Sequence, residues 1–99
     1  MYSIDVIKAM VTPIAEYYGI KTVWLFGSYA RGEQTEQSDM DFHIDRGDVC
    51  SGLVLGAFFA DLEEAFTTKI DVVTTQSLSK EFLEQIKEEE ILLYAKKEL

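Results

Sequence analysis

Three aspartates are the residues of this sequence whose types and spacing could do chemistry. Asp39 and Asp41 lie two residues apart at the head of an alternating apolar and polar segment, and Asp71 lies in a later β-rich run. On an extended strand, such a pair leaves the same face roughly 6.5 Å apart. Two carboxylates so placed raise each other's pKa unless a cation lies between them. Three of them could hold one Mg²⁺, or two about 3.5–4 Å apart, together with substrate phosphates.

A turn rich in small residues lies between the apolar run 22–26 and the first two aspartates. It begins with Gly27 and Ser28 and carries Arg31. A glycine lets backbone N–H groups approach an anion closely, and the serine hydroxyl adds a donor. The guanidinium of Arg31 is a planar fork that could neutralise phosphate charge. Gly27, Ser28 and Arg31 are therefore the candidate nucleotide-binding residues, and the aspartates are the candidate metal ligands and catalytic groups.

Each of these features also has a plain structural explanation. A Gly-Ser pair can be only a turn, and acids on an alternating strand can simply face solvent. Asp71 alone could be an exposed strand residue, His43 could contact substrate or stay solvated, and Tyr29 could stack on a base or pack the loop. The combination of three aspartates and a glycine turn, in this order, favours a metal and phosphate site.

The elements that must position these side chains follow from periodicity and turn residues. Apolar residues at helical spacing from Ile4 to Tyr18 predict an amphipathic helix that contains Pro13 and ends at Gly19. The further predicted elements are a buried strand at 22–26, a loop with one helical turn at 27–38, a half-buried strand at 40–45, a helix at 51–66, a strand at 69–74, a helix from Ser77 or Ser79 to about 89, and a short strand at 91–94.

This order predicts an α/β (α+β) fold, a small mixed sheet with helices packed on one face, because two strands in succession argue against a purely parallel sheet. Ninety-nine residues suit a single domain spanning 1–99. In the segment 40–45, the even-numbered residues are apolar and predicted to face the core. The odd-numbered ones, with Asp39, carry polar side chains on the other face.

The composition limits the partners. A net charge of −9 makes direct nucleic-acid binding a poor expectation, and leaves a solubilising acidic surface or an acidic site for a metal or a basic partner. No apolar run is long enough to cross a membrane, and the beginning does not resemble a signal peptide. The lone Cys50 allows no internal disulfide, so a cytoplasmic location is expected.

The runs LFGSYARG (25–32) and SDMDF (38–42) closely resemble the signature of the DNA polymerase beta-like nucleotidyltransferases. Their minimal members, the MNT domains encoded beside HEPN ribonuclease toxins, are the most similar. The resemblance covers nearly the whole chain. It implies metal binding by Asp39 and Asp41, a metal and catalytic role for Asp71, and triphosphate binding by Gly27 and Ser28.

The resemblance also implies a function: a Mg²⁺-dependent antitoxin that transfers AMP from ATP to a tyrosine of its HEPN toxin partner. The alternative is a non-catalytic antitoxin that neutralises its partner by contact, although binding alone gives no reason to gather three acids at one point. A small-molecule adenylyltransferase is disfavoured, because such enzymes carry an additional lobe.

Overall fold

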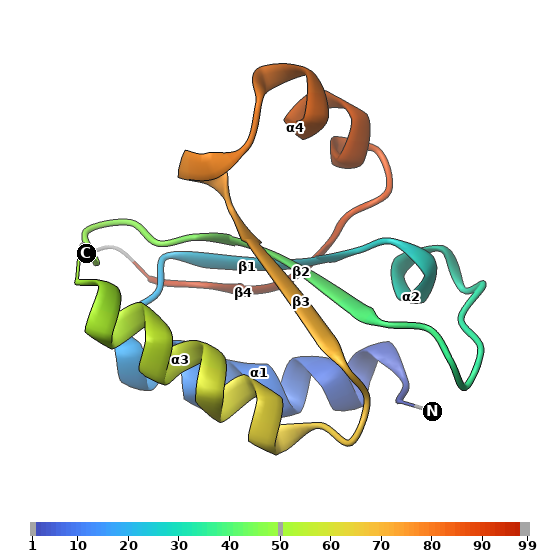
Figure 1. The fold of residues 1–99 in the computed structure, drawn as a ribbon, viewed down its shortest axis with the longest axis horizontal. Helices are drawn as coiled ribbons and strands as arrows, with labels where there is room; N and C mark the ends of the chain where they lie inside the picture. The colour runs from blue at the N-terminus through green and yellow to red at the C-terminus, as the bar shows by residue number, and fades with distance from the viewer. Residues whose placement is uncertain (1, 50, 98–99) are drawn as a thin grey trace.

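The computed structural model describes residues 2–49 and 51–97, so Cys50 lies outside the described part of the chain. The helices and strands follow the predicted order. They are α1 (Ile4–Tyr18), β1 (Thr22–Phe26), α2 (Ser28–Arg31), β2 (Met40–Asp45), α3 (Gly52–Ala65), β3 (Ile70–Thr74), the 3-10 turn η1 (Thr75–Ser77), α4 (Lys80–Lys87) and β4 (Ile91–Ala95) (Figure 1).

Local capping explains where the helices begin and end. The side-chain oxygens of Ser3, Ser51 and Ser79 each accept the backbone N–H three residues further on, at the starts of α1, α3 and α4. Of the two serines predicted to cap the last helix, Ser79 is therefore the one used. Gly19 ends α1 with a φ of 73°, a conformation that glycine adopts readily. Pro13 does not interrupt α1, which continues to Tyr18.

The sheet has the strand order β3-β2-β1-β4. β1 pairs antiparallel with β2 and with β4, whereas β2 pairs parallel with β3. The predicted mixed sheet is thereby confirmed, and its parallel pair places Asp41 opposite Asp71 in register. Neighbouring strands lie about 4.8 Å apart, so this register brings two candidate site residues together from distant parts of the chain.

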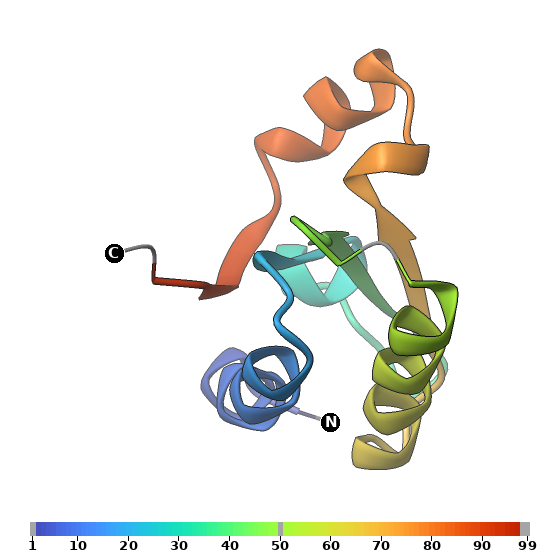
Figure 2. The same ribbon diagram turned by 90° about the vertical axis from the view of Figure 1, so that its left-hand side faces the viewer.

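Helices lie on both sides of this sheet. α1 and α3 cover one face, as predicted, whereas α4, which was expected on the same face, lies beyond the opposite one (Figures 1 and 2). The buried core lies under α1 and α3, and its largest fully buried side chains are Phe42, Phe58, Ile7, Ile20, Leu25, Met40, Ile44, Leu62 and Leu93. On the opposite face, Phe82 of α4 meets Phe26 of β1 edge to face, with ring centroids 6.1 Å apart. The candidate site lies on this second face.

His43 is buried rather than solvated, with only 3 % of its surface exposed. Its Nδ1–H donates to the Glu90 carboxylate at 2.9 Å, and its Nε2 lies 2.7 Å from the hydroxyl of Thr75. The ring stacks on Trp24 with centroids 4.5 Å apart. His43 therefore joins β2 to the segments around α4, and its satisfied nitrogens fit a structural role. Tyr29 is also buried, so it packs in the core and is no base-stacking platform.

Candidate active site

The three predicted metal ligands lie on two neighbouring strands. Asp39 directly precedes β2, Asp41 is its second residue, and Asp71 is the second residue of β3. Residues two apart on a strand share a face, and Asp41 and Asp71 are partners in the parallel register. Asp71 is exposed, whereas Asp39 and Asp41 are half-buried. Backbone pairing therefore brings all three aspartates to one end of the sheet, where β2 and β3 begin.

The predicted phosphate turn meets these aspartates at Gly27. Phe26 is the register partner of Asp41, so the next residue of the chain, Gly27, lies beside that carboxylate. A Cβ atom at Gly27 would overlap the Oδ2 of Asp41 and lie 3.2 Å from its Cγ. The backbone also has a φ of 76° and a ψ of −155°, a region open essentially only to glycine. Glycine is thus required here on two independent grounds.

The surroundings of Asp41 disfavour the negative charge of its carboxylate. Burial, together with the nearby carboxylates of Asp71 and Asp39, raises the pKa of Asp41 to about 6. The carboxylate of Glu89 adds to this effect, and the guanidinium of Arg31 opposes it. A cation between the aspartates would remove the repulsion that raises this pKa. The arrangement is therefore suited to a positively charged ligand.

The donor set fits Mg²⁺ in kind, and the strand register brings its members to the same end of the sheet. Carboxylate oxygens are its preferred protein ligands, and Mg²⁺ usually takes only one or two of them and completes its sphere with water and phosphate oxygens. Within residues 2–49 and 51–97, however, no three acidic, histidine or cysteine side chains already converge on one point where a metal ion would fit. The backbone aligns the aspartates, and a bound ion would have to draw their side chains together.

Ser28 and Arg31 lie on α2, the short helix that follows Gly27. Ser28 is half-buried at the first position of this helix. Arg31 lies at the last position, with 43 % of its side chain exposed. Its Nε donates to Glu33 at 2.9 Å and its Nη1 donates to Glu89 at 3.0 Å, so carboxylates hold the guanidinium from two sides. All six predicted site residues therefore lie around the end of β1 and the beginnings of β2 and β3.

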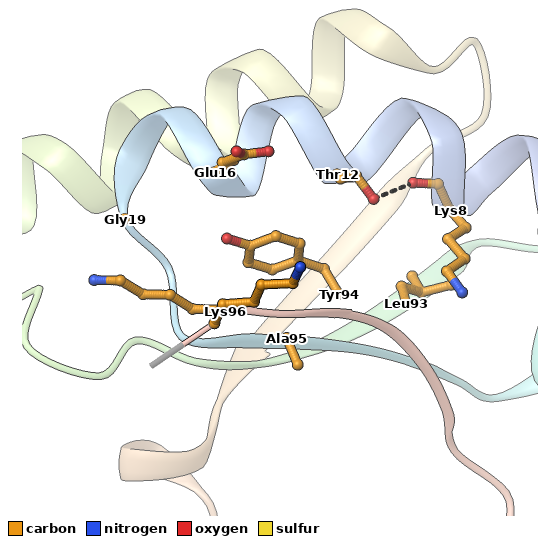
Figure 3. Close-up of a pocket in the computed structure, with 9 residues that line it drawn as sticks. Lys8, Thr12, Glu16, Gly19, Leu93, Tyr94, Ala95 and Lys96 are labelled. Carbon is orange, nitrogen blue, oxygen red and sulfur yellow. Dashed lines mark hydrogen bonds between the residues drawn. The ribbon is translucent and has the colours of Figure 1, made fainter. Parts of the chain in front are cut away.

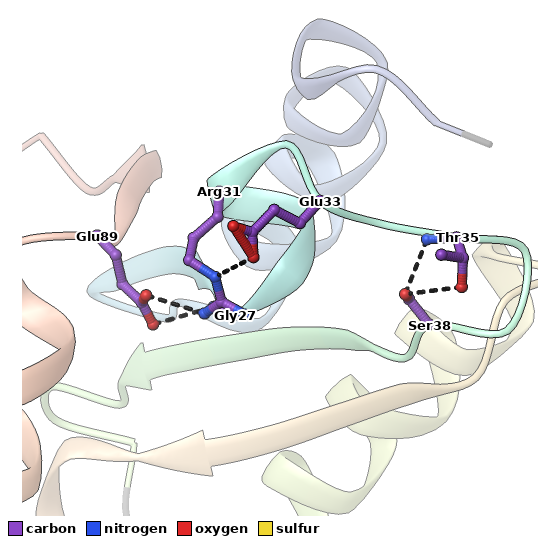
Figure 4. A network of polar contacts seen from close by, with 6 residues as sticks. All are labelled: Gly27, Arg31, Glu33, Thr35, Ser38 and Glu89. Atoms are coloured by element: carbon purple, nitrogen blue, oxygen red, sulfur yellow. Dashed lines mark hydrogen bonds and ion pairs between the residues drawn. The ribbon is translucent and has the colours of Figure 1, made fainter.

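Glu89 is a residue of this site that the sequence pattern does not indicate. Glu89 was assigned to the end of a helix, but its carboxylate accepts hydrogen bonds from Arg31 and, at 3.4 Å, from the backbone N–H of Gly27 (Figure 4). It lies just before β4, whose first residue, Ile91, pairs with Leu25 of β1. Antiparallel pairing of β4 with β1 therefore brings Glu89 to the Gly27 turn. The run Glu88 to Glu90 shows no local signal that distinguishes one acid from the next.

A second concave region lies away from these residues. A groove of about 580 Å³ runs between α1 and β4 and is lined by Lys8, Thr12, Glu16, Gly19, Leu93, Tyr94, Ala95, Lys96 and Lys97 (Figure 3). None of the six predicted site residues lines it, so it is separate from the carboxylate cluster. In the described residues, no helix combines the length and the apolar character needed to cross a bilayer.

Comparison with known proteins agrees with this geometry. The family model described as polymerase beta nucleotidyltransferase matches residues 9–99. A Methanocaldococcus jannaschii protein provisionally named a protein adenylyltransferase is 40 % identical over 76 residues, which cover 77 % of this chain and 82 % of that protein.

Two solved structures share the fold. One, provisionally described as a minimal nucleotidyltransferase, has a TM-score of 0.78 at 26 % identity and covers 91 % of this chain and 95 % of its own. The other is an MNT antitoxin in complex with a tri-AMPylated HEPN toxin of Shewanella oneidensis. It has a TM-score of 0.70 at 17 % identity and covers 94 % of this chain and 73 % of its own. With its family signature on a matching fold, this chain belongs to the polymerase beta family of nucleotidyltransferases.

Proposed function

We propose that this nucleotidyltransferase uses Mg²⁺ and ATP to transfer AMP to a tyrosine hydroxyl of a HEPN toxin, and so acts as its antitoxin. The observation that carries the proposal is the register that sets Asp41 beside Asp71, with Asp39 on the same face and the Gly27 turn against them. The MNT antitoxin with a similar fold, bound to a tri-AMPylated HEPN toxin, supports the partner and the group transferred.

Each side chain has a role in this reaction. Asp39, Asp41 and Asp71 would hold the metal, which when bound neutralises charge on the phosphates and on the leaving group. The Gly27 N–H, the Ser28 hydroxyl and the Arg31 guanidinium would bind the triphosphate in line with the acceptor. Catalysis would then rest on positioning and on charge neutralisation, as in other phosphoryl transfers.

The chemical step needs one proton acceptor. The acceptor hydroxyl oxygen forms a bond to the α-phosphorus of ATP while the bond from that phosphorus to the β-bridging oxygen breaks. The hydroxyl proton passes to the carboxylate of Asp71, and pyrophosphate leaves. Asp71 is exposed, so a protein acceptor could reach it from solvent.

The test is the intact mass of a HEPN toxin after incubation with this chain, ATP and Mg²⁺. The wild type should add one or more AMP groups, and EDTA should prevent this addition. Asp71→Asn is nearly isosteric but removes a charge at the reacting centre, so the transfer rate should fall by about two orders of magnitude or more.

The control is Asp5→Asn, because Asp5 is an exposed residue in the first turn of α1, on the opposite side of the sheet. It should keep nearly the wild-type rate. If the wild type adds no AMP, and it and Asp71→Asn neutralise the toxin equally well, the chain is a non-catalytic binding module and the enzymatic proposal is wrong.

A further inference from the structure

Glu89 contacts two of the groups that the proposed function assigns to the triphosphate. Its Oε2 accepts the Nη1–H of Arg31 at 3.0 Å, and its Oε1 accepts the backbone N–H of Gly27 at 3.4 Å (Figure 4). The two oxygens of one carboxylate thus bridge a guanidinium and a backbone amide. A phosphate group binds to proteins through the same pair of donors.

The backbone fixes Glu89 in this place. The N–H groups of Glu89 and Glu90 both donate to the carbonyl oxygen of Ile86, at 3.0 and 2.9 Å, which closes the last turn after α4. Glu90, the next residue, is held by the buried His43. The side chain of Glu89 is 28 % exposed, so it keeps a path to solvent although its backbone is anchored.

We infer that, in the nucleotide-free protein, the carboxylate of Glu89 occupies the position of a triphosphate oxygen between Gly27 and Arg31, and that the nucleotide must displace it. Glu89 is then an affinity-determining residue of the site, acting as an internal competitor of the substrate. The inference rests on the proposed function, because it takes the Gly27 turn as the phosphate site.

The charges around the turn support this exchange. Glu89 accepts from the Gly27 N–H, and Gly27 itself lies against the carboxylate of Asp41, so the free site holds one acid more than the aspartates alone. A phosphate bound beside an undisplaced Glu89 would meet that negative charge directly. Because the side chain of Glu89 is partly exposed, its carboxylate can turn into water when a phosphate binds.

Arg31 has a second carboxylate partner besides Glu89. Its Nε is held separately by Glu33 at 2.9 Å, so removal of the Glu89 charge leaves the guanidinium anchored and frees its Nη1. A residue that merely positions Arg31 would weaken nucleotide binding when it is replaced. A competitor for the same donors would strengthen it. The two roles therefore predict opposite changes in affinity.

The experiment measures the dissociation constant of the full chain for a non-hydrolysable ATP analogue with Mg²⁺, by calorimetry. Glu89→Gln keeps the size of the side chain and removes its charge, and should bind the analogue about tenfold more tightly than the wild type. Glu88→Gln is the matched control, because Glu88 is the exposed neighbouring acid and should keep the wild-type constant. Melting curves establish that both variants are folded.

The Gly27 amide signal in NMR spectra gives a second readout that needs no nucleotide. Glu89→Gln should shift it in the free protein, and Glu88→Gln should not. Unchanged or weaker binding by Glu89→Gln, while the wild type binds, overturns this inference and leaves the proposed function standing. If neither protein binds the analogue, the phosphate site itself is wrong, and both proposals fall.

Discussion

Gly27 is the residue of the site at which both the backbone conformation and the contact with Asp41 require glycine. Its φ of 76° with a ψ of −155° excludes other residues, and its missing side chain leaves room for the carboxylate of Asp41. Gly32, at the other end of α2, has a similar φ of 72° but no atom within 4 Å of the place where a Cβ would stand. Gly32 has a ψ of 22°, in the αL region that other residues can enter, so Gly27 is the more demanding position both in its backbone conformation and in its contacts.

We expect Gly27→Ala to destabilise the protein more than Gly32→Ala. Gly27→Ala places a side chain in a backbone region essentially restricted to glycine, and Gly32→Ala places one in the αL region, at a cost of about 1–3 kcal/mol each. Only the first also drives a Cβ into Asp41, which should add at least ~1 kcal/mol. Urea unfolding of both variants measures the difference. Equal losses would show that the turn relaxes and that the contact with Asp41 does not require glycine.

The raised pKa of Asp41 predicts a pH dependence of stability. Because the folded state holds this proton up to about pH 6 while the unfolded carboxyl loses it near 3.8, the folded state binds more protons in this window. The free energy of unfolding should therefore fall as the pH rises from about 4 to 6. Asp41→Asn should remove this part of the slope in urea unfolding curves recorded across that range.

Asp45 provides the control for this measurement. Burial favours a higher pKa for Asp45, but hydrogen bonds from the Gly47 N–H and the Gln76 amide, with the charge of Lys21, outweigh it and lower the pKa. Its contribution to stability is thus complete above about pH 4 and is lost below it. Asp45→Asn should lower the stability by a similar amount throughout the range 4 to 6. If Asp41→Asn leaves the pH dependence of the unfolding free energy unchanged, the raised pKa of Asp41 is not its cause.

At the scale of elements, the connection between α4 and β4 determines what reaches the site from the far end of the chain. Its anchor is the buried pair of His43 and Glu90, whose side chains are only 4 % and 13 % exposed. The pair ties the turn to β2, the strand that carries Asp41. The same turn places Glu89 beside Gly27. Disruption of the anchor should therefore loosen α4 before it affects the core under α1 and α3.

His43→Ala tests this anchor. It removes a ring stacked on Trp24 and leaves the Glu90 carboxylate without its partner, so we expect a loss of about 3 kcal/mol in unfolding free energy. Amide hydrogen exchange should increase most across residues 80–90. Glu88→Gln, an exposed change in the same turn, should alter stability by less than about 0.5 kcal/mol. A uniform increase in exchange throughout the molecule would argue against a local anchor.

At the scale of the whole molecule, the net charge of −9 affects how fast the protein associates with a charged partner. If the proposed partner presents a basic surface, the field of the protein should speed their encounter, and salt should screen it. We expect the association rate constant to fall about tenfold or more between 20 and 300 mM salt, with a smaller change in the dissociation rate constant. Surface plasmon resonance measures both. An association rate that ignores salt would exclude electrostatic steering.

The sequence alone determined most of the local structure. The bounds of the first two strands were predicted correctly, because alternation and turn residues act over a few neighbouring positions. The spacing of Asp39 and Asp41 fixed their common face, since residues two apart on any strand share one. The turn at Gly27 could also be predicted, because a glycine and small polar residues directly after an apolar run indicate a turn. These features need no knowledge of which strands are neighbours.

Only the tertiary structure decided which distant residues meet. Asp71 joins Asp41 because β3 pairs in parallel register with β2, and many registers are compatible with the same local pattern. His43 lies on the polar face of its alternating strand, but Glu90, in the turn after α4, and Thr75 of η1 bind both of its ring nitrogens. Glu89 reaches the Gly27 turn because β4 pairs with β1, more than sixty residues earlier in the chain. Periodicity specifies which way a side chain faces, whereas strand order and register specify what it faces.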